Sequence, residues 1–321
     1  MNRLKTMIRQ LATLALAGLL LAGGAAATEV RIGYQKSSLN LIVLKSRGIL
    51  EQRLAAAGHS VKWHEFAAGP QLLEALAVGS VDVGMTGDTP PIFAQAAGTP
   101  LVYVGFEPPK PQASAILVPA DSAIRKLADL KGKRIALQKG SSAHWLLVRA
   151  LDKAGLKWDD IQPAYLAPAE ARAAFERGSV DAWVIWDPFY AAAQKSLAPR
   201  VLASGDGLVA NQSFYLASRR FAAEQTRLLQ AVFDALSDND DFLEQQPAEA
   251  ARVLSRAVGL DVPTFDQVVA RRPSFKVTWL TPQVVAEQQR IADRFAELKL
   301  IPKPVAVKEI VWQPQPQPQP Q

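Results

Sequence analysis

The stretch GSVDVGMTGDTPP, Gly79 to Pro91, decides the fold because the chain repeats it about a hundred residues later. The second copy is GSVDAWVIWDPFY, Gly178 to Tyr190. In both copies an aspartate, Asp88 or Asp187, stands nine residues after the first glycine, and proline follows it closely. An apolar run that ends in Asp and Pro is typical of a strand that enters a turn and then a helix.

The segments upstream of the two copies match as well. RIGYQKSS, Arg31 to Ser38, corresponds to RIALQKGSS, Arg134 to Ser142, with one inserted glycine. After each of them come a helical pattern, a second strand, a second helix and then the repeated strand. Strand and helix therefore alternate three times in each half. This alternation predicts an α/β fold in which two similar lobes each contain a parallel sheet covered by helices.

The repeat also predicts where the lobes begin and end. Lobe 1 is expected to combine residues 28–112 with residues 213–312, and lobe 2 to span residues 113–212. The chain would then cross between the lobes twice, and two crossings form a hinge. The region after Ser213 is predicted to form one strand and then helices that pack back against lobe 1. Asparagine and proline predict ends of these helices near Asn239, Pro247, Pro263 and Pro273.

Both ends of the chain differ in composition from the repeated part. Basic residues and then an apolar run from Leu11 to Gly23 predict a secretory signal peptide, residues 1–27, that is cleaved after Ala27. The alternative is a membrane anchor, but the apolar run is shorter than the roughly 20 residues that span a bilayer. Residues 313–321 alternate proline and glutamine, which predicts an extended tail that does not pack.

Composition narrows the classes of function. The predicted signal peptide contains three of the 36 Lys and Arg residues, so the mature chain would have 33 basic residues against 30 Asp and Glu and a small net charge. The chain has no long basic run, so we do not expect a nucleic-acid partner. The absence of cysteine excludes disulfides, a lipid-modified N-terminal cysteine, thiolate metal sites and a cysteine nucleophile. The three histidines are scattered, so we expect neither a zinc site nor a cofactor. An exported chain of this kind is predicted to be a soluble, monomeric periplasmic protein.

The predicted sheets bring four polar segments together. In open α/β sheets, ligands bind beyond the carboxyl ends of the strands. The segments at those ends are Gln35 to Ser38, Thr86 to Asp88, Gly140 to Ser142, and Trp186 with Asp187. If the lobes face each other, all four segments meet in one cleft.

The residue types in these segments favour an anionic ligand. A helix N-terminus offers unpaired N–H groups and a partial positive charge. Ser141 and Ser142 can add hydroxyl donors, and Thr86 with Gly87 can do the same from the other lobe. The alternative is that these residues cap the helices and bind no ligand.

Five residues have competing interpretations. For Asp88 and Asp187, helix capping is the preferred interpretation, since a carboxylate that faces an anion would oppose its binding. The alternative is that one of them contacts the ammonium group of a zwitterionic ligand. Trp186 is predicted to form an apolar wall of the pocket, and core packing is the alternative. Ser141 and His144 resemble a nucleophile and its base, but no third orienting group accompanies them, so an enzyme is not expected.

Several strings resemble one family of transport proteins. GYQKSS, VYVGFEPPKP, LKGKRIALQKGSSAH, RAAFERGSVDAWVIWDPFY and IVWQP are similar to segments of the periplasmic aliphatic-sulfonate-binding proteins. These proteins are the substrate-binding components of ABC importers. The resemblance covers about Val30 to Pro314. It implies a two-lobed periplasmic binding fold, type II-like with two crossovers, that closes around a sulfonate and delivers it to a membrane permease driven by an ATPase.

The resemblance also implies a set of ligand-binding residues. By matching strings this set contains Gln35, Thr86, Gly87, Asp88, Ser141, Ser142, His144, Trp186 and Asp187. RRPSF adds Arg272, which either reaches the cleft or caps a helix. Relatives that bind nitrate, taurine or thiamine precursors share the architecture, so a taurine- or nitrate-type ligand remains an alternative. An enzyme of the same fold, a desulfinase, needs a cysteine nucleophile that this chain lacks.

Overall fold

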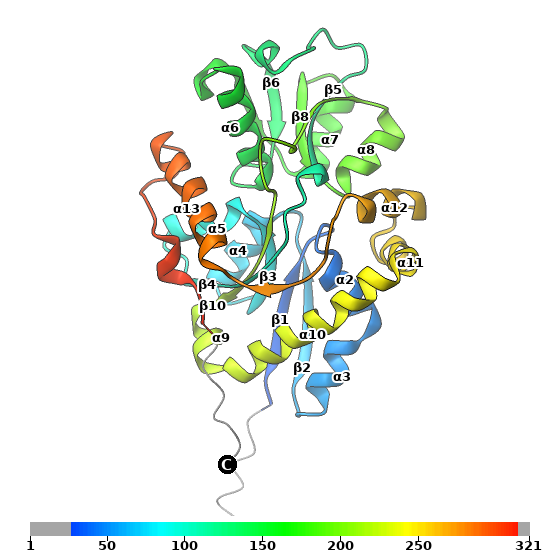
Figure 1. Cartoon of the computed structure of the whole chain (residues 1–321), viewed down its shortest axis with the longest axis vertical. Helices are drawn as coiled ribbons and strands as arrows, with labels where there is room; N and C mark the ends of the chain where they lie inside the picture. Colours follow the sequence, from blue (N-terminus) through cyan, green and yellow to red (C-terminus); the bar gives the residue numbers. More distant parts are fainter. Residues whose placement is uncertain (1–26, 314–321) are drawn as a thin grey trace, which may run out of the picture.

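Residues 27–313 are described in a computed structural model, and they form two α/β lobes along the long axis of the molecule (Figure 1). The predicted signal peptide and the predicted Pro/Gln tail lie outside the described residues, apart from Ala27 and Gln313. Within residues 27–313, no helix combines the length and the apolar character that a membrane span requires.

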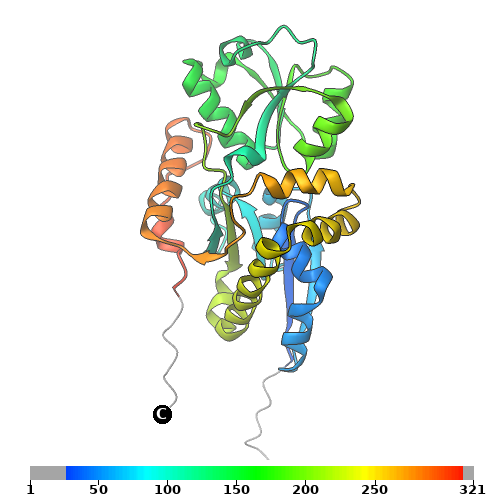
Figure 2. The same cartoon turned by 45° about the vertical axis from the view of Figure 1, so that its right-hand side comes forward.

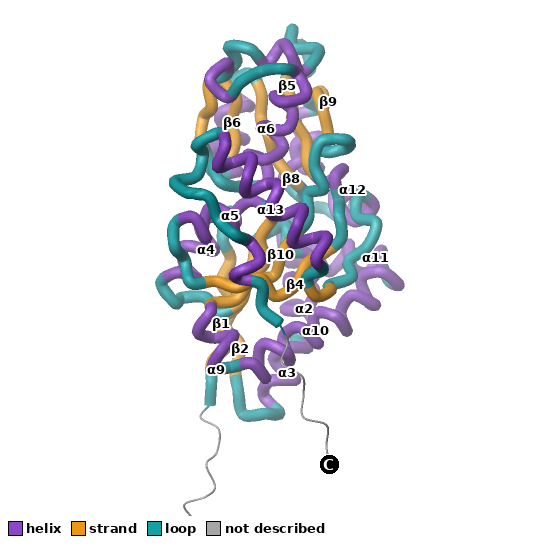
Figure 3. Tube along the Cα trace, turned by 60° about the vertical axis from the view of Figure 1, so that its left-hand side comes forward, coloured by secondary structure: helices purple, strands orange, loops and turns teal. Residues whose placement is uncertain are grey.

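Lobe 1, as we use the name from here, is built on a six-stranded sheet in the order β11-β4-β10-β3-β1-β2. Its strands are β1 (Glu29–Tyr34), β2 (Ser60–Glu65), β3 (Val83–Gly87), β4 (Leu101–Glu107), β10 (Ser213–Ser218) and β11 (Thr278–Trp279). One face carries α2 (Leu39–Arg47), α3 (Ile49–Ala55), α10 (Thr226–Gln245), α11 (Pro247–Val258) and α12 (Val262–Ala270). The other face carries α4 (Gly69–Ala77), α5 (Thr89–Ala96) and α13 (Pro282–Glu297), and α9 (Arg219–Glu224) follows β10. Figure 3 shows the strands enclosed between these helices.

Lobe 2 is built on a five-stranded sheet in the order β7-β6-β8-β5-β9. Its strands are β5 (Ser114–Val118), β6 (Arg134–Leu137), β7 (Gln162–Tyr165), β8 (Ala182–Trp186) and β9 (Arg200–Ser204). The main helices are α6 (Ser142–Ala154), α7 (Pro168–Glu176) and α8 (Phe189–Leu197). The chain passes from lobe 1 to lobe 2 between β4 and β5 and returns between β9 and β10.

The prediction of parallel sheets is right for the repeated strands and wrong for the strands that follow each crossing. β1 runs parallel to β2 and β3, and β6 runs parallel to β7 and β8. β10 runs antiparallel to β3 and β4, and β5 runs antiparallel to β8 and β9. The reason is where these strands begin: Ser213 pairs with Gly87, and Ser114 pairs with Trp186, both at the lobe boundary. A strand that enters from the other lobe must run away from it.

The Gly-Ser-Val-Asp repeat has a structural role at the opposite end of each sheet. The Asp82 carboxylate accepts a hydrogen bond from the backbone N–H of Arg31 at 2.9 Å, and Asp181 accepts one from Arg134 at 2.7 Å. In return, the N–H groups of the two aspartates donate to the carbonyls of the two arginines at 2.9 and 2.8 Å. Each motif therefore ties the start of its third strand to the start of its first. The repeat builds the lobes, and the ligand-facing residues lie at the far end of the same strands.

One predicted helix end in the C-terminal region is wrong. α10 continues through Asn239 to Gln245. The Asn239 side chain is buried and donates to the side-chain oxygen of Asn40 at 2.9 Å, so a tertiary partner satisfies the amide that would otherwise compete with the helix. The proline predictions are confirmed, since Pro247 begins α11, Pro263 lies in the first turn of α12 and Pro273 follows the end of α12.

Two C-terminal helices also touch lobe 2. α12 lies beside α8, as Figure 2 shows, and Lys195 of α8 forms an ion pair with Asp261 at the N-terminus of α12. α13 packs on α5 of lobe 1, and its Arg294 pairs with Asp152 of α6 at 2.6 Å. These contacts hold the two lobes together on both sides of the lobe boundary.

Candidate ligand-binding site

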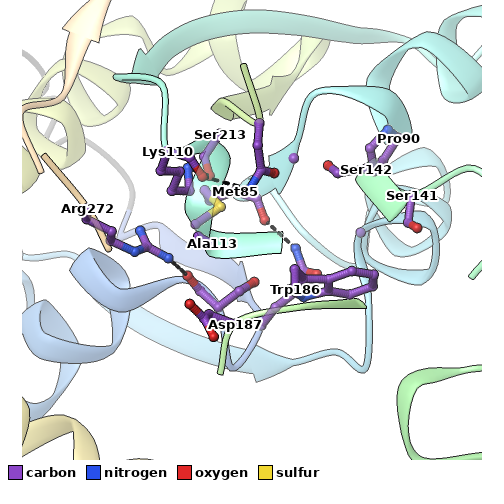
Figure 4. A pocket seen from close by; sticks show the side chains of 15 residues that line it. Met85, Pro90, Lys110, Ala113, Ser141, Ser142, Trp186, Asp187, Ser213 and Arg272 are labelled. Atoms are coloured by element: carbon purple, nitrogen blue, oxygen red, sulfur yellow. Dashed lines mark hydrogen bonds between the residues drawn. The ribbon is translucent and has the colours of Figure 1, made fainter. Parts of the chain in front are cut away.

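A cavity lies between the lobes at the carboxyl ends of β1, β3 and β8 (Figure 4). The volume open to the centre of a water molecule is about 40 Å³, which is room for a few waters or one compact head group. Seven of the ten predicted ligand residues line it: Gln35, Gly87, Ser141, Ser142, Trp186, Asp187 and Arg272. All four predicted segments therefore meet at one place. Thr86, Asp88 and His144 lie outside the lining.

The serines at two helix N-termini next to the cavity do not act as caps. Ser38 precedes α2 and Ser141 precedes α6, and neither side chain accepts a hydrogen bond from its helix. The Ser38 hydroxyl accepts from the backbone N–H of Gln35 at 3.0 Å, and the Ser141 hydroxyl donates to the carbonyl of Gln138 at 2.7 Å. The first turns of α2 and α6 therefore keep N–H groups that no side-chain cap occupies, as an anion site requires.

The turn before α5 offers fewer donors than the sequence predicts. Asp88 precedes this helix, and Pro90 and Pro91 occupy its first turn. Proline has no N–H group, so this end of α5 can donate little to a ligand. Thr86 is buried, and its hydroxyl donates to the carbonyl of Gly87 at 3.0 Å.

Asp88 does not cap α5, so the capping interpretation is wrong for this residue. Its carboxylate accepts a hydrogen bond from the Thr89 hydroxyl at 2.9 Å. Burial raises the pKa of Asp88, and the hydroxyls of Thr89 and Ser142 oppose that rise. The backbone carbonyl of Asp88 accepts from the side chain of Gln288 on α13. Asp88 thus links α5 and α13 from a position behind the cavity wall.

Asp187 behaves as a helix-capping carboxylate, although its place differs from the expected one. Pro188, and not Asp187, is the residue that precedes α8. The Asp187 carboxylate accepts from the N–H of Ala191 at 3.0 Å and from the Arg271 guanidinium at 2.8 and 3.1 Å. Burial raises the pKa of Asp187 to about 6, against the lowering effect of Arg271. Because Arg271 belongs to lobe 1, this ion pair also joins the lobes beside the cavity.

A cationic cluster forms one side of the cavity, and the sequence interpretation named its Arg272 but missed its Lys110. The Lys110 ammonium lies 2.6 Å from the hydroxyl of Ser213 and 3.5 Å from a carboxylate oxygen of Glu107. The Arg272 guanidinium lies 3.2 Å from the same oxygen and donates to the carbonyl of Ser37 at 3.0 Å. Within residues 27–313 neither cation has an ion pair with another carboxylate. Two buried cations beside the cavity thus share Glu107 as their ion-pair partner among the described residues.

The two cations keep hydrogen-bonding capacity for a ligand. Burial lowers the pKa of Lys110 to about 8, while Glu107 favours the charged form. The Nε–H of Arg272 is buried and has no hydrogen-bond partner among the described residues. Arg272 lines the cavity, and because its side chain donates to Glu107 and to the carbonyl of Ser37, it does not cap a helix. Figure 4 shows Arg272 and Lys110 on one side of the cavity, with Ser141 and Ser142 on the other.

His144 lies in an aromatic cluster and not in the cavity. Its ring packs against the rings of Phe93, Trp158, Tyr165 and Phe295. Its Nδ1 accepts a hydrogen bond from the N–H of Gly140 at 3.2 Å, and burial lowers the pKa of His144 to about 3. Since the Ser141 hydroxyl points to Gln138, Ser141 and His144 do not form a nucleophile–base pair.

The lobes are closed over the cavity. Gly87 of lobe 1 lies so near Ser142 of lobe 2 that a methyl group on Gly87 would overlap the Ser142 hydroxyl. A methyl group on Gly140 would lie 3.3 Å from the ring of Phe93, again across the lobe boundary. Trp186 forms an apolar wall of the cavity and is 9% exposed, with its ring edge-on to that of Phe189.

Solved structures of sulfonate-binding proteins are similar to this chain. The alkanesulfonate-binding protein SsuA from Xanthomonas axonopodis pv. citri, solved bound to MOPS, superposes with a TM-score of 0.85 at 50% identity and covers 88% of this chain and 98% of its own. The periplasmic aliphatic sulphonate binding protein SsuA from Escherichia coli gives a TM-score of 0.81 at 48% identity, over 91% of this chain and 94% of its own.

A family model and one sequence relative agree with these structures. A protein of Escherichia coli (strain K12) described as an aliphatic-sulfonates-binding protein is 48% identical over 313 residues, which is 96% of this chain and 98% of that protein. The model of the NMT1/THI5-like family matches residues 54–250. The fold is that of the periplasmic binding proteins, and the chain, which is similar to aliphatic-sulfonate-binding proteins over most of its length, belongs to the NMT1/THI5-like family.

Proposed function

We propose that this protein is a periplasmic substrate-binding protein that captures an aliphatic sulfonate between its lobes and delivers it to the permease of an ABC importer driven by an ATPase. The observation that carries the proposal is the pair of buried cations, Lys110 and Arg272, that share Glu107 at the cavity between the lobes. The 48% identity to an aliphatic-sulfonates-binding protein supports the choice of ligand class. We propose that the protein acts as a monomer, without nucleic acid, metal or cofactor.

The donor set suits a sulfonate better than a phosphate. A sulfonate carries one negative charge, has no proton to donate and therefore needs only donors around it. Phosphate near neutral pH retains an O–H group that needs an acceptor. Among the described residues that line the cavity, Asp187 is the one carboxylate, and its oxygens are engaged by Arg271 and Ala191.

Closure of the lobes would be the response to the ligand. A ligand that touches both lobes stabilises the closed form in proportion to its preference for that form. Ser141, Ser142 and Trp186 belong to lobe 2, whereas Gln35, Gly87 and Arg272 belong to lobe 1. Ethanesulfonate has six heavy atoms, so at about −1.5 kcal/mol per atom its binding cannot exceed about −9 kcal/mol, a Kd of roughly 0.3 μM.

Taurine and nitrate match the cavity less well than an alkanesulfonate does. Taurine adds an ammonium group, which would need a carboxylate that is not already engaged, and Asp187 is paired with Arg271. Nitrate would use the donors but would leave the face of Trp186 without a contact. An enzyme is disfavoured because His144 faces aromatic rings and Ser141 bonds a backbone carbonyl.

The test is calorimetric titration of the mature protein in Tris, since common sulfonate buffers would compete. We expect binding of ethane- and butanesulfonate and at least tenfold weaker binding of phosphate, nitrate and taurine. Lys110→Met should weaken sulfonate binding, and Lys62→Met, at an exposed lysine of β2, serves as the matched control. Failure of every alkanesulfonate to bind would refute the proposal. Turnover of a sulfonate that Ser141→Ala abolishes would favour an enzyme instead.

A further inference from the structure

Among the described residues that line the cavity, one carboxylate is able to attract a cationic group of a ligand. It belongs to Asp187, which directly follows β8 and whose side chain is 1% exposed. Figure 4 shows Asp187 at the cavity beside Trp186. Lys110 and Arg272 lie at the same cavity and suit an anionic head group. An ionised Asp187 would oppose that head group unless a further cation neutralised it.

Arg271 supplies this cation from outside the cavity lining. Its guanidinium donates to both oxygens of Asp187, at 2.8 and 3.1 Å, and the backbone N–H of Ala191 donates to one of them at 3.0 Å. The guanidinium carbon also lies 3.9 Å from the centroid of the Tyr190 ring, and the guanidinium donates to the side-chain oxygen of Gln194. Arg271 directly follows α12 of lobe 1, whereas all four partners belong to lobe 2, so the closed arrangement of the lobes holds the guanidinium against Asp187.

Burial and Arg271 act on the Asp187 carboxylate in opposite directions. Burial raises the pKa of Asp187 to about 6, and Arg271 is the largest cause that opposes this rise. Without Arg271, the buried carboxylate would either take up a proton or pair with another cation. The ammonium group of taurine, at the end of a two-carbon chain from its sulfonate, would be such a cation.

We infer that Arg271 makes the site selective for sulfonates without an ammonium group, because it occupies the carboxylate that would hold such a group. The inference rests on the proposed function. Arg271 is not among the residues that line the cavity, so it acts on the ligand through Asp187. An alkanesulfonate leaves the pair of Arg271 and Asp187 intact, whereas taurine would have to compete with the guanidinium for the carboxylate.

The competing interpretation is that this ion pair only holds the lobes together. A second ion pair, between Lys195 of α8 and Asp261 at the N-terminus of α12, joins the same two regions without touching Asp187. A pair that serves closure alone changes the affinity of every ligand in the same proportion. A pair that sets selectivity changes the ratio of two affinities, so the ratio separates the two roles.

The experiment is calorimetric titration of the mature protein with ethanesulfonate and with taurine, which differ by the ammonium group alone. Arg271→Gln and Arg271→Met both remove the guanidinium charge. In each of them the ratio of taurine affinity to ethanesulfonate affinity should rise at least about tenfold, the lower limit expected for a hydrogen bond to a charged group. Arg271→Lys keeps a positive charge beside Asp187 and should leave the ratio as it is in the parent.

Two further variants test the route through Asp187. Lys195→Gln breaks the neighbouring ion pair between the lobes and is the matched control, so it should leave the ratio unchanged. Asp187→Asn in the Arg271→Gln background removes the carboxylate that would hold the ammonium group. The gain for taurine should disappear in this double variant.

Three results would overturn the inference. The first is an unchanged ratio in Arg271→Gln and Arg271→Met. The second is the loss of binding of both ligands in these variants, which would show that the pair serves closure alone. The third is a rise of the ratio that Lys195→Gln shares or that the double variant retains. If ethanesulfonate fails to bind the parent, the proposed function itself is refuted, so the two failures are distinguishable.

Discussion

A tight contact between the lobes at the cavity gives the sharpest prediction. Gly87→Ala adds a methyl group that would overlap the Ser142 hydroxyl and lie 3.2 Å from its Cβ, and both atoms belong to the opposite lobe. Gly87 does not have a positive φ, so alanine fits its backbone. The substitution should therefore leave lobe 1 intact and raise the free energy of the closed form only.

The expected loss of affinity follows from the hydrogen bond that Ser142 loses. To avoid the methyl group, its hydroxyl must rotate away from the Asp88 carboxylate that it faces. Loss of a hydrogen bond to a charged group costs about 1.5–3 kcal/mol. Because the ligand binds the closed form, that cost appears in the affinity, which should fall about 10- to 150-fold.

The assay is a double-mutant cycle measured by calorimetric titration with ethanesulfonate. Ser142→Ala removes the hydroxyl that Gly87→Ala would strike, so Gly87→Ala should cost at least about 1 kcal/mol less in that background. Urea unfolding of Gly87→Ala should show no loss of stability, and a gain of about 0.4–1 kcal/mol is the usual effect of such a substitution. Purely additive effects, or an unchanged affinity in Gly87→Ala, would refute the closed geometry of the site.

Three further predictions concern the charged and buried groups. Lys110→Met should weaken sulfonate binding about 10- to 150-fold. In the parent the affinity should fall as the pH rises above about 8, because Lys110 of the free protein then loses its proton, whereas Lys110 beside the bound anion keeps it. Titration across pH 7–10 should show this slope in the parent but not in the variant. His144 has a pKa of about 3 in the folded protein and an ordinary pKa of 6.5 in the unfolded chain, so the unfolded chain binds more protons between these pH values. The free energy of unfolding should therefore fall by up to about 1.4 kcal/mol per pH unit on acidification. Urea unfolding at pH 4–7 should show a weaker dependence of this free energy on pH in His144→Phe. Asp82→Ala should lower the free energy of unfolding by about 1.5–3 kcal/mol without changing sulfonate affinity, since Asp82 ties β3 to β1 far from the cavity, and a loss of affinity in a folded variant would contradict this structural role.

Local sequence patterns were sufficient to predict most of the helices and strands. The duplicated strand, turn and helix have the same spacing in both lobes, and apolar periodicity with proline near the helix starts is a property of short segments. The pattern failed at Asn239, where a partner nearly two hundred residues away, Asn40, satisfies the side chain and lets α10 continue. It also failed for the direction of β5 and β10, because strand direction depends on where the chain enters a sheet.

Part of the site was predicted from the repeat and Arg272 from the family resemblance, whereas Lys110 and Ser213 were missed. Ser141, Ser142 and Trp186 stand in the duplicated segments, and they line the cavity. Lys110 and Ser213 stand next to the two crossings, outside the repeat. The one local signal for Lys110 is its place in EPPKP, a lysine among prolines at a crossing between lobes.

By itself the sequence determined two lobes of repeated α/β units, with polar residues at the strand ends that face each other. The tertiary structure alone decided that Lys110 and Arg272 share the carboxylate of Glu107, although 165 residues separate Arg272 from Glu107. It also decided that Asp187 pairs with Arg271 and that His144 lies among aromatic rings. The physical reason is that charge balance and pKa depend on distance and on loss of water, and packing sets both of these for residues that are remote along the chain.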